Sequence, residues 1–174
     1  YPVQEYDSPE QLCDFVGRAF IRLIEREFPE WTVEKIDKKL GIKERHVVAD
    51  DETASDLAVH AASKLFGDCG IDRLSIDYVI FVSQSADYFL PTTACLVQER
   101  LGLSHDIAAI DVNLGCSGFV YGLSIAKGMI LGGMATNVLL LTAETYSKYI
   151  HFRDKGNRTI FGDAAAATLI STDG

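Results

Sequence analysis

The feature that most constrains the fold is a set of short, apolar, β-branched runs that recur along the chain. The clearest is 78-YVIFVS-83, in which no charged residue interrupts the apolar ones. A run without alternation of polar and apolar residues is typical of a strand buried on both faces, as in a parallel sheet. Mainly apolar runs also occupy 107–112, 138–142 and 165–171. The sequence therefore predicts four strands with little exposed surface.

Helical patterns precede and separate these runs. The expected helices span 9–28, 30–40, 53 to about 67 or 70, 91–101 and 117–132. Thr53 with Asp56 three positions later carries a capping-box signal, and Gly41 and Gly102 are typical helix ends. The segment 143–159 is expected to be a long polar connection. Strands that alternate with helices predict an α/β sandwich with parallel strand pairs and right-handed crossovers.

Three polar or glycine-rich segments directly follow predicted strands. They are 83–85, 113–117 and 142–145. Ligands in folds of this class bind beyond the carboxyl ends of the parallel strands. We therefore expect these three segments to meet at one edge of the sheet and to form the functional site.

Composition and charge exclude several classes of partner. The chain is 48% apolar and 24% charged, with a formal net charge of −9. This acidic balance disfavours binding to nucleic acid or to an anionic membrane. No apolar run reaches the roughly 18 uninterrupted residues of a membrane span, and no signal peptide opens the chain. We therefore expect a cytoplasmic protein with neither kind of partner.

The cysteines show no metal-binding or disulfide pattern. The chain has 4 of them, Cys13, Cys69, Cys95 and Cys116, widely spaced and without a CxxC pair. We expect reduced thiols and no metal site. Cys13, Cys69 and Cys95 lie in or at the ends of expected helices, so we interpret them as structural.

Cys116 stands apart because it lies in a glycine-rich turn, 112-VNLGCSGFVYG-122, between a strand and a helix. A nucleophile on such a turn is raised above the sheet, and a following helix favours its thiolate. Small neighbours such as Gly115 and Gly118 would let a substrate carbonyl approach. The alternative is a small apolar side chain that fills a gap, as free cysteines often do. The residues alone leave both interpretations open.

A cysteine nucleophile usually needs a base. His151 is the one histidine in the long segment after the third strand. Its spacing does not place it near Cys116, so a cysteine hydrolase stays a weak alternative. Two basic stretches, 35-KIDKK-39 and 153-RDKGNR-158, interrupt the acidic chain and suit either an anionic ligand or a solvated surface.

Six stretches together carry a family resemblance. They are 30-EWTV-33, 41-GIKERHV-47, 52-ETASDLA-58, 91-PTTACLVQERLG-102, 111-DVNLGCSGFVYGLSIA-126 and 161-FGDAAAATLIS-171. In this order the chain resembles the N-terminal half of the β-ketoacyl-acyl carrier protein synthase III family, within the thiolase-like condensing enzymes. The resemblance implies that residues 1–174 form an N-terminal thiolase-like domain of a two-half enzyme, with the C-terminal half absent. The implied fold is a βαβαβαββ unit with a mixed, mostly parallel sheet flanked by helices.

The resemblance also implies an activity. Cys116 matches the family's acyl-accepting cysteine. In the family, an acyl group is transferred from acyl-CoA to this cysteine and is then condensed with malonyl-acyl carrier protein, in fatty acid or related lipid or secondary-metabolite biosynthesis. The family binds no permanent cofactor, forms homodimers and carries its catalytic His and Asn in the second half. The isolated chain is therefore expected to be inactive.

Three binding positions carry over by the same resemblance. Trp31 matches the tryptophan that stacks on the CoA adenine, and Lys155 falls where the family has an arginine on the other adenine face or near the phosphates. Lysine keeps the charge of arginine but loses its planar stacking. Leu90 falls where fatty-acid enzymes often have a phenylalanine that reaches into the partner's acyl pocket.

Two departures from the family pattern leave other functions open. The segment between Trp31 and Gly41 is longer than usual, and the family's FGDGAGA loop reads FGDAAAA here. One alternative is a relative that moves acyl groups to oxygen or nitrogen acceptors in a polysaccharide or secondary-metabolite pathway. Another is a non-catalytic structural half.

Overall fold

The computed structural model describes residues 24–42 and 44–172, which fall into two compact units. The sheet unit contains Asp51–Glu144 and the segment from Ala165 onward. The helical unit contains the residues up to Asp50 and Thr145–Ala164. Most of the first expected helix lies outside the described residues, and residues 24–27 form its last turn.

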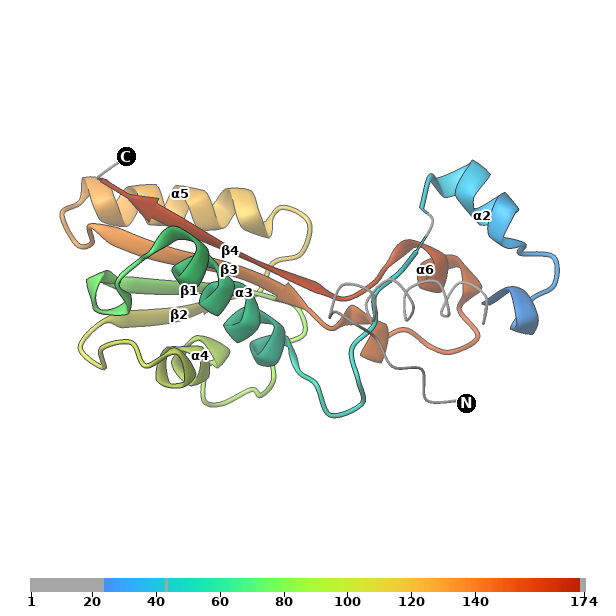
Figure 1. The fold of residues 1–174 in the computed structure, drawn as a ribbon, viewed down its shortest axis with the longest axis horizontal. Coiled ribbons are helices and arrows are strands. Elements are labelled where there is room, and N and C mark those ends of the chain that lie inside the picture. The colour runs from blue at the N-terminus through green and yellow to red at the C-terminus, as the bar shows by residue number, and fades with distance from the viewer. Residues whose placement is uncertain (1–23, 43, 173–174) are drawn as a thin grey trace. The chain divides into compact units, whose positions relative to one another are not determined.

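All four predicted strands are confirmed. They are β1 (Tyr78–Val82), β2 (Ala108–Val112), β3 (Asn137–Glu144) and β4 (Ala164–Ser171), in the sheet order β2-β1-β3-β4. β1 is parallel to both β2 and β3, with Ile80 opposite Ile110 and Leu140. Figure 1 shows the arrow of β4 pointing against that of β3, so the sheet is mixed and mostly parallel.

Helices cover both faces of the sheet, which explains the unbroken apolar runs. Side chains alternate between the two faces of a strand. In β1, Val79 and Phe81 belong to one core cluster, whereas Ile80 and Val82 belong to another. The first cluster includes residues of α3 (Ala54–Cys69) and α4 (Thr93–Leu101), and the second includes residues of α5 (Gly118–Leu131). The expected α/β sandwich is therefore confirmed (Figure 1).

The capping signals in the sequence mark the true helix ends. At the start of α3, Oδ2 of Asp56 accepts hydrogen bonds from the Thr53 N–H at 2.7 Å and the Thr53 hydroxyl at 2.8 Å. α3 ends at Gly70 and α4 at Gly102, with φ of 64° and 65°. Glycine adopts this left-handed conformation without steric cost, so Gly70 rather than Gly67 ends the helix.

A carboxylate on the sheet fixes the start of α4. Asp111 of β2 accepts hydrogen bonds from the backbone N–H groups of Thr93 at 2.8 Å and Ala94 at 2.7 Å. These are first-turn N–H groups that have no partner within a helix, and a negative charge also suits the positive end of the helix dipole. The contact ties α4 to the edge strand β2.

The helical unit contains α2 (Val33–Leu40) and the short α6 (Lys155–Ile160). The sequence predicted that the helix before Gly41 starts at residue 30. It starts at Val33 because Thr32 caps it, with its hydroxyl oxygen accepting from the Lys35 N–H at 3.2 Å. The core of this unit joins buried Ile24 and Ile36 to partly buried apolar neighbours, among them Trp31.

The prediction of a long polar connection over 143–159 is wrong. β3 continues to Glu144, and residues 155–160 form α6. Asp154 caps α6 by accepting a hydrogen bond from the Asn157 N–H at 3.0 Å. A helix of 6 residues whose only large apolar side chain is Ile160 has no apolar periodicity, so the pattern that identifies helices was missing here.

Two of the quoted sequence motifs meet in the helical unit at Asp163. This buried carboxylate accepts from the Val48 N–H at 2.9 Å and from the Ser147 N–H at 2.8 Å. The Asp163 N–H donates to the His46 carbonyl at 2.8 Å. A side chain at Gly162 would have its Cβ 2.9 Å from that same carbonyl oxygen. The FGD and GIKERHV motifs are therefore a matched structural pair.

Candidate functional site

Cys116 lies in the turn that joins β2 to α5. The Gly118 N–H donates to the Gly115 carbonyl at 2.7 Å, which closes the turn around the cysteine. The Cys116 side chain is exposed. It therefore fills no gap in the described core, which contradicts the interpretation of a buried apolar side chain.

The glycines around Cys116 have a packing role that sequence reasoning missed. A Cβ at Gly118 would lie 2.4 Å from Cγ1 of Val82, and one at Gly122 would lie 2.6 Å from Cδ1 of Leu140. A Cβ at Gly115 would lie 2.4 Å from Oε1 of Gln84. We expected small residues here so that a substrate could approach. The structure shows a further role, because these glycines let the turn and α5 pack closely on β1, β3 and the loop after β1.

The start of α5 gives Cys116 an electrostatic setting that suits an anion. α5 is 14 residues long, and its N-cap residue, Ser117, makes no side-chain capping hydrogen bond. Backbone N–H groups of the first turn and the positive end of the helix dipole therefore lie beside Cys116. Among the described residues no side-chain-bearing residue has a positive φ, so this turn holds Cys116 on ordinary backbone.

Glu144 joins the ends of two neighbouring strands. Its carboxylate accepts from the Gln84 N–H at 2.7 Å and from the Ser85 hydroxyl at 2.7 Å. The Ser85 N–H in turn donates to the buried Ser83 hydroxyl at 3.0 Å. Gln84 also lies against Gly115, next to Cys116. The prediction that 83–85, 113–117 and 142–145 meet at one edge is confirmed for the parts within the sheet unit.

Sequence reasoning missed Gln84 and Glu144 as individual site residues. Both follow buried strands, which is a signal that could have identified them. The identity of the bonded partner, 60 positions away in the chain, has no signature in spacing.

Trp31 and Lys155, predicted as binding residues, lie close together in the helical unit. Nζ of Lys155 is 6.0 Å from the centroid of the Trp31 ring and 2.5 Å from Oε1 of Glu30. Nζ of Lys35 is 5.8 Å from the same ring. One indole therefore has two ammonium groups near it, a combination that suits a ligand with an aromatic ring and negative charge.

The remaining candidates are exposed. Leu90 is 84% exposed and follows exposed Tyr88 and Phe89 in the loop after β1. His151 accepts a hydrogen bond at Nδ1 from the Arg153 N–H at 3.2 Å, a contact local to its own turn. Cys69 and Cys95 are also exposed, so neither fills the core. Cys13 lies outside the described residues.

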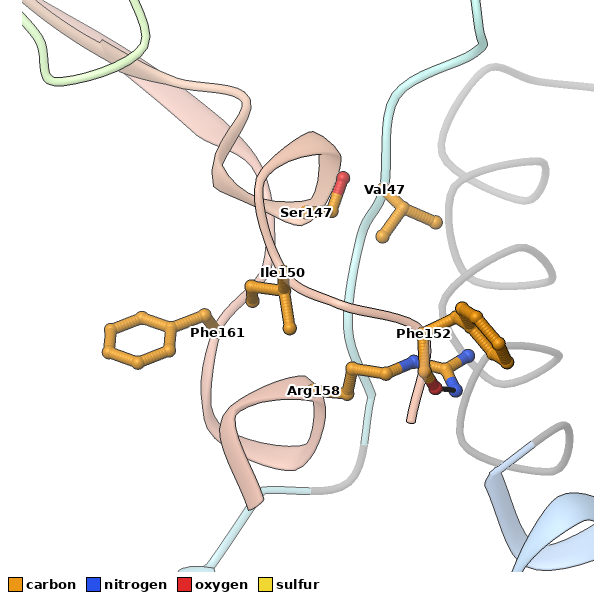
Figure 2. A pocket seen from close by; sticks show the side chains of 6 residues that line it. All are labelled: Val47, Ser147, Ile150, Phe152, Arg158 and Phe161. Carbon is orange, nitrogen blue, oxygen red and sulfur yellow. Dashed lines mark hydrogen bonds between the residues drawn. The ribbon is translucent and has the colours of Figure 1, made fainter. Parts of the chain in front are cut away.

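A pocket of about 230 Å³ lies within the helical unit. Its lining, shown in Figure 2, consists of Val47, Ser147, Ile150, Phe152, Arg158 and Phe161. The guanidinium of Arg158 donates to the Phe152 carbonyl at 2.5 Å and to the Glu27 carboxylate at 2.7 Å. None of the predicted site residues lines this pocket.

Two further searches of the described residues bear on function. No helix in the described ranges is long and apolar enough to cross a membrane. Within the same ranges, no group of three or more His, Cys, Asp or Glu side chains is placed to hold a metal ion.

Comparison with known proteins identifies close relatives. A family model described as 3-oxoacyl-[acyl-carrier-protein (ACP)] synthase III matches residues 110–174. A β-ketoacyl-[acyl-carrier-protein] synthase III of Nitratidesulfovibrio vulgaris (strain DP4) is 40% identical over 95% of this chain and 51% of its own length. Its counterpart in Sulfurovum sp. (strain NBC37-1) is 43% identical over 82% of this chain and 41% of its own length.

A solved structure extends the likeness to the fold. The crystal structure of a 3-oxoacyl-(acyl-carrier-protein) synthase III has 51% identity and a TM-score of 0.86, and the match covers 88% of this chain and 46% of that one. The chain thus spans about half the length of the relatives it matches. In sequence and fold it belongs to the 3-oxoacyl-[acyl-carrier-protein] synthase III family of thiolase-like condensing enzymes.

Proposed function

We propose that the chain is the N-terminal thiolase-like domain of a two-half acyltransferase in which Cys116 carries the acyl group. The observation that carries this proposal is the exposed Cys116 at the start of α5, within a fold of the synthase III family. The first substrate is an acyl-CoA, and the second is malonyl-acyl carrier protein. Neither step needs a permanently bound cofactor.

In the first step the Cys116 thiolate attacks the carbonyl carbon of the acyl-CoA thioester. The carbon–sulfur bond to Cys116 forms as the bond to the CoA sulfur breaks, and the CoA thiolate leaves and takes up a proton. The Cys116 N–H supplies one donor to the oxyanion of the intermediate. The first-turn N–H groups and the positive dipole end of α5 lie beside the sulfur.

In the second step the malonyl group loses CO₂ and its carbanion attacks the acyl carbonyl on Cys116. A new carbon–carbon bond forms, the bond to Cys116 breaks, and the product stays on the carrier protein. We assign the His and Asn that assist this step to the second half of the enzyme, as the family resemblance implies.

The binding residues have separate roles in this proposal. Trp31 stacks on the adenine of CoA, and Lys155 pairs with its phosphates. Leu90 contributes to the acyl site of a partner subunit in a homodimer. Leu90 is exposed and Trp31 and Lys155 are partly exposed, which supports contact of all three with a ligand or a partner. The proposed enzyme acts in the cytoplasm.

The test is a condensation assay on the full-length protein from its native reading frame. We expect the protein to form β-ketoacyl-carrier protein from acyl-CoA and malonyl-carrier protein. The rate of product formation should fall by at least about 100-fold in Cys116→Ala, because without the nucleophile no covalent acyl intermediate can form. Cys95→Ala, another exposed cysteine, serves as the control and keeps the activity. Product formation by Cys116→Ala at the unsubstituted rate would overturn the proposal.

A second acceptor class gives a different product in the same assay. If Cys116 is acylated but no carbon–carbon bond forms, hydroxyl and amine acceptors replace malonyl-carrier protein in the reaction. An acyl ester or amide that depends on Cys116 would then favour the polysaccharide or secondary-metabolite alternative.

A further inference from the structure

The contact between Glu30 and Lys155 joins two distant parts of the chain within the helical unit. Oε1 of Glu30 lies 2.5 Å from Nζ of Lys155, and the two residues are 125 positions apart. Their side chains are 53% and 42% exposed. The ammonium group that the proposed function pairs with the CoA phosphates is therefore already paired with a carboxylate.

Aromatic rings also hold the Lys155 ammonium group. Its Nζ lies 5.5 Å from the centroid of the Phe28 ring and 6.0 Å from that of Trp31. Two rings and one carboxylate thus lie around it before any ligand binds. A phosphate that approaches Trp31 must share the three N–H donors of Lys155 with Glu30, whose carboxylate already accepts from one of them and offsets the positive charge.

We propose that Glu30 is a specificity-determining residue that weakens the hold of Lys155 on ligand phosphates. The inference rests on the proposed function, because it concerns the acyl-CoA site of that function. Glu30 acts as an internal competitor that favours ligands whose phosphates can displace a carboxylate. A dianionic phosphate displaces it more readily than a monoanionic diphosphate oxygen does.

The exposure of the pair makes such an exchange feasible. Exposed ion pairs contribute little net stability, so opening the contact costs little. The hydrogen bond from Lys155 keeps the pKa of Glu30 below its ordinary value, so the competing carboxylate is charged at neutral pH. Both effects point to a modest, salt-dependent restraint on phosphate binding.

Lys35 contacts the backbone of Glu30 rather than its carboxylate, so the two contacts of Glu30 can be tested separately. Its Nζ donates to the backbone carbonyl of Glu30 at 2.7 Å and not to the carboxylate. The substitution Glu30→Gln therefore retains the acceptor of Lys35 and removes only the charge that competes for Lys155. Glutamine also has nearly the same size and shape.

The test is calorimetric titration of the full-length protein with CoA, and with adenosine as a ligand that lacks phosphate. We expect Glu30→Gln to bind CoA about 2- to 5-fold more tightly at low salt, the size that an exposed pair allows. We expect no change in the affinity for adenosine. In a Lys155→Met background, Glu30→Gln should have no effect on CoA.

Two outcomes would overturn the inference in different ways. Unchanged or weaker CoA binding in Glu30→Gln, with measurable binding by the unsubstituted protein, would contradict the role of Glu30 alone. Absence of CoA binding by the unsubstituted full-length protein would contradict the proposed function as well, and with it the inference.

Discussion

Each glycine near Cys116 contacts a different kind of neighbour. At Gly118 an added Cβ would meet Val82, a buried side chain of the central strand β1. At Gly115 it would meet the amide end of Gln84, which is exposed and can rotate away. The two glycines therefore differ in how much a methyl group costs, although they flank the same cysteine.

This difference yields a matched pair of variants. We expect Gly118→Ala to destabilise the protein by about 1–3 kcal/mol, because overpacking a buried contact forces α5 away from β1. Gly115→Ala should cost less, because Gln84 can adopt another rotamer. Urea denaturation of both variants measures the difference. Equal stability losses in the two variants would contradict the packing explanation.

For single residues, the sequence predicted Cys116 as a candidate nucleophile but did not predict why glycines surround it. Cys116 was identifiable from its glycine-rich turn, because strand, turn and helix signals are all local. The contacts of Gly115, Gly118 and Gly122 depend on which side chains of other strands face them. That information comes from register and from three-dimensional packing rather than from residue spacing.

Among the elements, Glu144 holds the loop after β1 to the end of β3. We expect Glu144→Ala to destabilise the sheet unit by about 1–3 kcal/mol, because the Gln84 N–H and the Ser85 hydroxyl lose their acceptor. Glu144→Gln retains one acceptor oxygen and should recover part of the loss. Denaturation midpoints of the two variants test this. A Gln variant no more stable than the Ala variant would argue against a role for these hydrogen bonds.

The start of α3 gives the fold a dependence on pH. Burial raises the pKa of Asp56, but hydrogen bonds from Thr53 and Arg100 and the charge of Arg100 outweigh it, so the net shift is downward. A carboxyl group whose pKa is lowered by folding stabilises the fold at pH values above its ordinary pKa. This contribution is lost as the pH falls through the lower pKa of the folded state.

We therefore expect Asp56→Asn to lower stability at neutral pH by about 0.5–2 kcal/mol, the range for a lost helix cap. The gap between the variant and the unsubstituted protein should begin to shrink below about pH 4, the ordinary pKa of an aspartate, and close as the pH falls through the lower pKa of folded Asp56. Thermal melts from pH 3 to 7 measure it. A gap that stays constant over this range would contradict the assigned role of the Asp56 charge.

Elements with a strong local pattern were predictable, and elements without one were not. β1 to β4 have mainly apolar runs, and α3 has a capping box, so their positions followed from the sequence. α6 is short and polar, and it was mistaken for part of a connection. The pairs Glu30–Lys155 and Asp163–Val48 join residues more than 100 positions apart, which spacing alone cannot reveal.

For the whole molecule, the chain spans about half the length of its matched relatives. We expect the 174-residue chain alone to form no β-ketoacyl product, because the proposed His and Asn belong to the second half. A product assay on the isolated chain and on the full-length protein, run side by side, tests this. Measurable product from the isolated chain would show that these 174 residues suffice for condensation.

The central claim is that Cys116 becomes covalently acylated, and the mass of the intact protein tests it most directly. The full-length protein is incubated with a panel of acyl-CoAs, beside its Cys116→Ala and Cys95→Ala variants. We expect a mass increase equal to one acyl group in the unsubstituted protein and in Cys95→Ala, and no increase in Cys116→Ala. An adduct that persists in Cys116→Ala, or no adduct with any acyl-CoA, would contradict the claim.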